Sequence, residues 1–119
     1  MAMAGRPTST IGAIGLQATN TIGYYAMFRA AIALLEHYGD MRPGWNHGRL
    51  EQALRREMVR ERGLVHDGDV RELRTVYALC IIADYRDRHI SSQEAQTSLD
   101  AASRFVAKIE GVIRGATHP

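Results

Sequence analysis

The sequence contains only one cysteine, one lysine and no apolar run long enough to cross a membrane. Because Cys80 has no second cysteine to pair with, an intrachain disulfide is excluded, and the scattered histidines offer no zinc-ligand spacing. The longest apolar stretch, 22–35, is too short for a transmembrane helix and contains Arg29. The first ten residues lack the apolar segment of a secretory signal. We therefore expect a cytoplasmic protein without a metal ion or cofactor.

The shortage of lysine leaves arginine as the source of nearly all positive charge, since Lys108 is the only lysine among 15 basic residues. The planar guanidinium group offers a fork of donors that suits phosphate and carboxylate groups. A genome that favours arginine codons would produce the same composition, and the net charge of only +2 fits that simpler interpretation. Composition alone therefore leaves a nucleic-acid partner open.

The sequence has no strand-like alternation and no hairpin turn, whereas helical periodicity recurs along it. We predict an all-α protein with a flexible N-terminal tail, 1–10, and a single domain over 11–115. That domain is expected to be an antiparallel up-and-down bundle of four or five helices. The hydrophobic content of 45% is sufficient for one packed core. The predicted helices cover 11–38, 47–62, a segment from 68 or 70 to 89, and 92–114.

Local signals mark several ends of these helices. Gly39 can adopt the left-handed conformation that ends the first helix. Ser91 and Glu94 have the spacing of a capping box, in which each side chain bonds to the other residue's backbone N–H at a helix start. Asp69 and Glu72 have the same spacing, so we predict a second capping box at the start of the third helix.

The first predicted helix carries two apolar stripes, which together cover most of its circumference. A helix that is apolar on two sides has to be buried on both. Because a bundle of this size easily covers one stripe, we expect the other to meet a partner subunit in a homodimer. The stripe assigned to the dimer interface comprises Tyr24, Met27, Ala31, Leu34 and Tyr38, and the other comprises Tyr25, Phe28, Ile32 and Leu35.

The second predicted helix and the loop before it are rich in arginine. Six arginines and three glutamates lie between residues 42 and 62. Glu51 and Arg55 are four residues apart and can pair along the helix. A solvated helix face is the simplest interpretation of this pattern. The alternative is a surface for RNA phosphates or an acidic partner.

The tyrosine pair Tyr24-Tyr25 and the sequence Ala-Asp-Tyr at 83–85 are the most specific of several sequence signatures between about 20 and 113. Taken in order, these segments resemble the helices of prokaryotic HEPN-domain proteins. The resemblance implies a four- or five-helix bundle that usually dimerises. Many members of this family are metal-independent RNases, often toxins encoded beside a nucleotidyltransferase antitoxin. The matching segments are 23–31 with 33–35, 47–48, 73–74 with 83–85, and 90–95 with 101–106.

The resemblance also implies a catalytic motif, an arginine followed four to six residues later by a histidine in the third helix. The arginine would hold the scissile phosphate while the histidine exchanges a proton with the RNA 2′-hydroxyl. Here Cys80 stands where an arginine is expected four residues before Asp84, and a neutral thiol cannot hold a phosphate. Arg86 precedes His89 by only three residues, so the motif is not intact.

Three functions are compatible with this sequence. We favour a HEPN-type module with a degenerate RNase motif that binds RNA or a partner protein in a toxin–antitoxin or defence system. The alternatives are an active metal-independent endoribonuclease and a structural helical adaptor without a nucleic-acid role. The candidate catalytic residues are Arg74, Arg88 and His89, and the candidate binding residues are Asn20, Arg29, Asp84 and Tyr85.

Overall fold

The computed structural model describes the backbone of residues 10–85 and 89–116 and the side chains of residues 15–82 and 89–115. These residues form helices and no strands, which confirms the predicted all-α class. None of the described helices is long and apolar enough to cross a membrane. The elements are α1 (Thr10–His37), α2 (His47–Ala53), the π-helical η2 (Leu54–Glu61), α3 (Asp67–Tyr85) and α4 (Ser92–Ala116).

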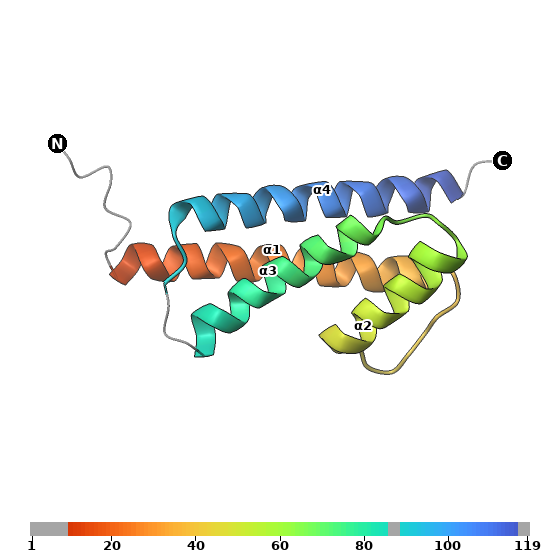
Figure 1. The fold of residues 1–119 in the computed structure, drawn as a ribbon, viewed down its shortest axis with the longest axis horizontal. Helices are drawn as coiled ribbons and strands as arrows, with labels where there is room; N and C mark the ends of the chain where they lie inside the picture. The colour runs from red at the N-terminus through yellow and green to blue at the C-terminus, as the bar shows by residue number, and fades with distance from the viewer. Residues whose placement is uncertain (1–9, 86–88, 117–119) are drawn as a thin grey trace.

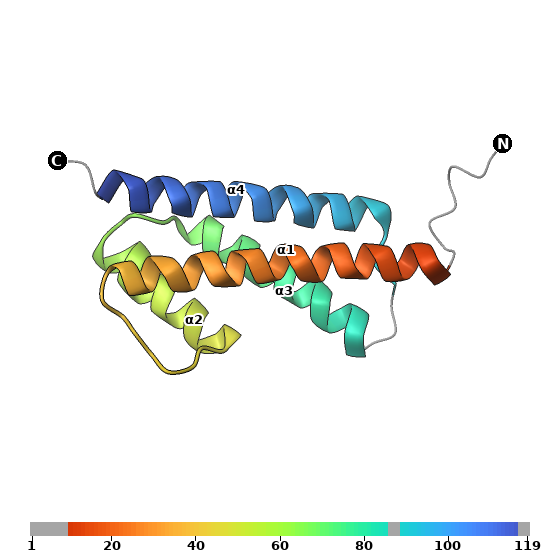
Figure 2. The same ribbon diagram turned by 180° about the vertical axis from the view of Figure 1, so that it is seen from behind.

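The helices α1 and α4 pack side by side and run in the same direction, while α3 crosses them in the opposite direction (Figures 1 and 2). The connection after α1 turns back along that helix, so that α2 and η2 run obliquely toward its C-terminal end (Figure 1). The predicted antiparallel order therefore holds for α3 with α1 and α4. The prediction is wrong for α4, which runs parallel to α1. It is also wrong for α2, which runs in the same general direction as α1 because the loop at 38–46 returns along that helix.

The hydrophobic core lies between α1, α3 and α4, and the α2–η2 segment closes it at one end. Met27, Ala31 and Leu34 of α1 are fully buried in this core. They pack in the same cluster as Phe105 and Ile109 of α4. The burial of side chains of this size is the main stabilising contribution to a small helical domain.

This core corrects the predicted dimer interface. Met27, Ala31 and Leu34 have 0% exposure within a single chain, so they have no surface to offer a partner subunit. Tyr24 and Tyr38, from the same stripe, are partly buried against the core. The assignment was wrong because helical periodicity shows that a helix has two apolar faces without showing which one its own chain covers.

The ends of α3 and α4 show how two similar sequence signals differ in the structure. The Ser91–Glu94 capping box is confirmed by two backbone–side-chain hydrogen bonds of 3.0 Å. The proposed Asp69–Glu72 box is wrong, because α3 begins at Asp67 and Asp69 instead accepts a hydrogen bond from the backbone N–H of His66 at 2.9 Å. Asp69 is therefore the third residue of the helix rather than its cap.

Candidate functional site

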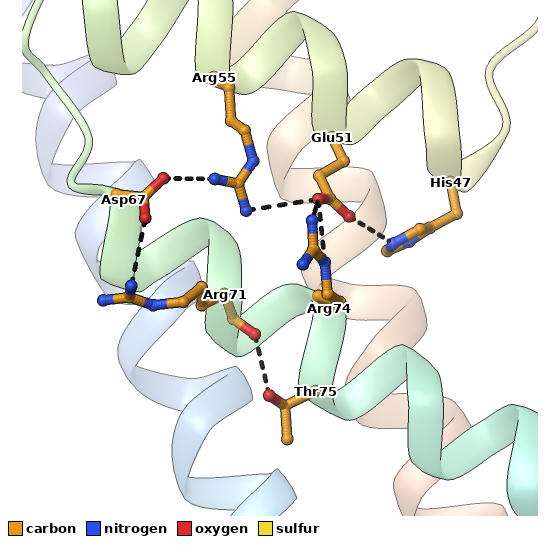
Figure 3. A network of polar contacts seen from close by, with 7 residues as sticks. All are labelled: His47, Glu51, Arg55, Asp67, Arg71, Arg74 and Thr75. Carbon is orange, nitrogen blue, oxygen red and sulfur yellow. Dashed lines mark hydrogen bonds and ion pairs between the residues drawn. The ribbon is translucent and has the colours of Figure 1, made fainter.

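A network of polar side chains joins α2, η2 and α3 at one surface of the bundle (Figure 3), and His47 connects this network to Tyr24 of α1. The Nδ1 atom of His47 lies 3.0 Å from Tyr24 Oη, and its Nε2 atom lies 3.0 Å from Glu51 Oε1. An ionised carboxylate can only accept, so Nε2 carries the proton, and in the neutral imidazole the Tyr24 hydroxyl therefore donates to Nδ1. The ring of Tyr77 stacks on the imidazole at a centroid distance of 3.9 Å.

The other oxygen of Glu51, Oε2, holds two arginines from different elements. Arg74 of α3 donates to it from Nε at 3.0 Å, and a terminal nitrogen of Arg55 lies 3.3 Å away. Arg55 also binds Asp67, which in turn lies 3.4 Å from Arg71 (Figure 3). These contacts fix the guanidinium group of Arg74, while 59% of its side chain remains exposed to solvent.

Burial and charge set the protonation of the network in different ways. Burial lowers the pKa of His47, and the hydrogen bond to Glu51 only partly opposes this shift. Burial acts to raise the pKa of Glu51, but the hydrogen bonds and charges of Arg74 and His47 together lower it. Burial also raises the pKa of Tyr24 well above its usual range. At neutral pH the network therefore contains a neutral imidazole, an ionised carboxylate and a protonated tyrosine.

Acidification from about pH 7.5 to pH 5.5 is expected to reduce the free energy of unfolding through His47. The unfolded chain takes up a proton on this residue near pH 6.5, whereas the folded chain does so only at lower pH. The stability that the neutral imidazole contributes is therefore complete above the ordinary pKa and is lost as the pH falls through the lowered pKa. Urea denaturation of the wild type and of His47→Gln at both pH values measures the effect.

The His47→Gln variant should lose less stability on acidification than the wild type. His66→Gln, which removes an exposed histidine, is the matched control and should behave like the wild type. An equal loss in the wild type and in His47→Gln would contradict a neutral His47 in the network.

A depression of about 560 Å³ opens beside this network on the surface formed by α2, η2 and α3. Three arginines and one glutamate contribute to it, which gives its lining an excess of positive charge. The guanidinium group of Arg49 is exposed and forms no ion pair with any described residue. The residues that line the depression are Asn46, Gly48, Arg49, Glu51, Gln52, Arg55 and Arg74.

The structure limits the chemistry that this surface supports. Both ring nitrogens of His47 are engaged, so neither is available to exchange a proton with a substrate in this arrangement. Among residues 15–82 and 89–115, no three histidine, cysteine or acidic side chains gather closely enough to hold a metal ion. The arrangement is therefore suited to holding an anion rather than to transferring protons.

Of the two predicted catalytic residues in the described part of the chain, Arg74 belongs to this network and His89 does not. His89 is exposed and lies beyond the end of α3, whose last residue is eleven positions after Arg74. With a rise of about 1.5 Å per residue, that distance corresponds to about 16 Å of helix. Arg74 and His89 therefore do not form one site. Arg88 and the side chains of Asp84 and Tyr85 lie outside the described part of the chain.

The predicted binding residues of α1 also lie away from the depression. Asn20 is 1% exposed, and its side-chain amide donates to Cys80 Sγ at 3.0 Å inside the bundle. It therefore has no surface for RNA. Arg29 is exposed, but it follows Tyr24 by five residues and lies about 140° around the helix from it. Arg29 therefore does not face the network.

Sequence reasoning did not identify Glu51 as the centre of the site. A signal for it exists, since His47, Glu51 and Arg55 are spaced by four residues and so share one helix face. The contributions of Tyr24 and Tyr77 depend on how α1 and α3 pack against α2, which no local spacing reveals.

No protein-family model, no curated protein and no solved structure matches this chain. The resemblance to HEPN-domain proteins consequently rests on the sequence motifs alone. The fold and the site together define an all-helical bundle that presents ordered arginines on one surface.

Proposed function

We propose that this protein is a HEPN-type RNA-binding module without an intact ribonuclease motif, and that RNA phosphates bind in the depression between α2, η2 and α3. The observation that carries the proposal is the convergence of Arg49, Arg55 and Arg74 on one surface. Guanidinium groups bind phosphate oxygens through paired, charge-assisted hydrogen bonds. Since Glu51 already orients two of these groups, less side-chain freedom is lost when RNA binds.

The contacts of His47 and Cys80 favour binding over cleavage. The two nitrogens of His47 are occupied by Tyr24 and Glu51. Cys80 stands where the resemblance would place an arginine, and it is buried beside Asn20. Neither residue therefore presents a proton-transfer group or a cation to a bound phosphodiester.

The proposal predicts salt-dependent RNA binding that depends on Arg49. Fluorescence anisotropy with a labelled RNA oligonucleotide should show affinity that falls steeply as salt is raised, because bound counterions are released from the phosphates. Arg49→Gln is expected to weaken binding about threefold and to reduce the salt slope by about 0.7, the value for one phosphate contact on a single strand. Arg29→Gln removes a charge that is also exposed but lies on another face, and it should change little.

Two outcomes would contradict this proposal. Absence of binding at low salt would remove the RNA function and leave the helical adaptor. Equal effects of Arg49→Gln and Arg29→Gln would show that net charge, and not the depression, governs affinity. Incubation of the same RNA with chelator present checks the enzymatic alternative, because specific cleavage lost in Arg74→Ala would identify an endoribonuclease.

We extend the proposal to a homodimer that uses a face other than the buried stripe. Ile22 and Tyr25 of α1 are 69% and 61% exposed, and Leu99 of α4 is 41% exposed. Ile22 and Leu99 line the same shallow depression between the two helices. Contiguous exposed apolar side chains of this kind are typical of protein interfaces. A protein partner such as a nucleotidyltransferase antitoxin is the alternative occupant of this face.

A further inference from the structure

A second depression adjoins the first at the start of α2 and contains Trp45, the only tryptophan of the chain. Asn46 and Arg49 line both depressions, so the two are continuous along the surface. The volume of the second, about 400 Å³, is within the range of ~300–1,000 Å³ that is usual for small-ligand sites. A ligand in it would lie directly beside a phosphate held by Arg49.

The wall of this depression is a stacked pair formed by Arg42 and Trp45. The central guanidinium carbon of Arg42 lies 4.4 Å from the centre of the indole ring. Asp40 holds the guanidinium plane through two parallel hydrogen bonds of 3.0 Å, donated by Nε and by a terminal nitrogen. Such a bidentate pair fixes the orientation of the plane. The surface therefore presents a flat cation, backed by an aromatic ring, that is positioned before any ligand arrives.

The indole N–H of Trp45 supports a ligand at this place. It is buried and finds no hydrogen-bond acceptor among the described residues. An unpaired buried donor is unfavourable, and a buried tryptophan N–H usually has a partner. The ring nitrogens and carbonyl oxygens of a nucleobase are acceptors of the required kind.

We propose that the Arg42–Trp45 pair is a nucleobase-binding site and that its ligand is single-stranded RNA, whose adjoining phosphate lies on Arg49. The inference rests on the proposed RNA function and adds the class of RNA to it. Unpaired bases stack on aromatic rings and on arginine planes, whereas the bases of a duplex are occupied by their own stacking and pairing.

The test compares three labelled probes on the intact chain: single-stranded octaadenylate, the same backbone without bases, and an octamer duplex. Octaadenylate should bind about tenfold more tightly than the baseless probe at equal salt. In Arg42→Lys, which keeps the charge but loses the flat guanidinium, this ratio should fall below about twofold. Fluorescence of the single tryptophan should change with octaadenylate and stay constant with the duplex.

The outcomes separate this inference from the function on which it rests. Equal binding of octaadenylate and the baseless probe would overturn the base site while leaving phosphate binding intact. Failure of every probe to bind at low salt would remove the RNA function itself. Adenosine monophosphate that binds more tightly than octaadenylate would assign the site to a free nucleotide and overturn the single-stranded RNA ligand. Arg60→Lys, an exposed arginine outside the depression, is the matched control and should leave the ratio at about tenfold.

Discussion

Leu34→Ala is expected to lower the free energy of unfolding by about 3 kcal/mol without changing the oligomeric state. The side chain is fully buried within its own chain, so truncation removes apolar contacts and leaves a cavity in the core. Urea denaturation measures the loss, and light scattering coupled to size-exclusion chromatography gives the oligomeric state. If Leu34 were instead an interface residue, its replacement would make the molecular mass fall with dilution.

Tyr25→Ala is the matched control on the other face of α1. This side chain is 61% exposed, so its truncation should change the stability of the monomer by less than about 0.5 kcal/mol. If the exposed face formed with Ile22 and Leu99 mediates dimerisation, Tyr25→Ala should shift the mass toward the monomer. The opposite result, a dissociated Leu34→Ala and an intact dimer in Tyr25→Ala, would restore the original assignment of the stripes.

The helical class could be predicted from the sequence because it depends on contacts that are local in the chain. The Ser91–Glu94 box and the turn at Gly39, whose φ is 94°, involve residues within a few positions of each other. The direction of α2 could not be predicted in this way. It is set by how the loop at 38–46 returns along α1, and helical periodicity has no information about loop paths.

The contacts of the site likewise include some that local spacing predicts and others that depend on how the helices pack. The contact between Glu51 and Arg55 follows from a spacing of four residues and was expected. The sequence predicts Arg74 as a site residue because it is a basic residue of the third helix, but its partner Glu51 lies 23 residues earlier on another helix. That contact exists only after α2 and α3 pack together. The π-helical turns of η2 add a further change of register that spacing rules for α-helices do not include.

Glu51→Gln is expected to have opposite effects on stability and on RNA binding. The substitution keeps the shape of the side chain but removes the charge to which His47 and Arg74 donate hydrogen bonds. Loss of these charge-assisted hydrogen bonds should lower the free energy of unfolding by about 1.5 kcal/mol. Arg55 and Arg74 would at the same time lose a competing anion, and we expect this gain in their availability to phosphate to outweigh the loss of the orientation that Glu51 gives them. We expect the affinity for single-stranded RNA to rise about threefold at low salt.

Glu72→Gln separates this local effect from the general effect of one added positive charge. Glu72 pairs with Arg104 of α4 at 2.7 Å and lines no part of the α2–α3 depression. Glu72→Gln changes the net charge by the same amount as Glu51→Gln. A rise in RNA affinity limited to Glu51→Gln would therefore place the phosphates on Arg55 and Arg74. Equal rises would indicate a diffuse electrostatic attraction. A fall in the RNA affinity of Glu51→Gln would contradict this prediction. It would mean that the Glu51 carboxylate is needed to hold the arginines in their binding orientation, and that this ordering matters more than the competition of the carboxylate with phosphate.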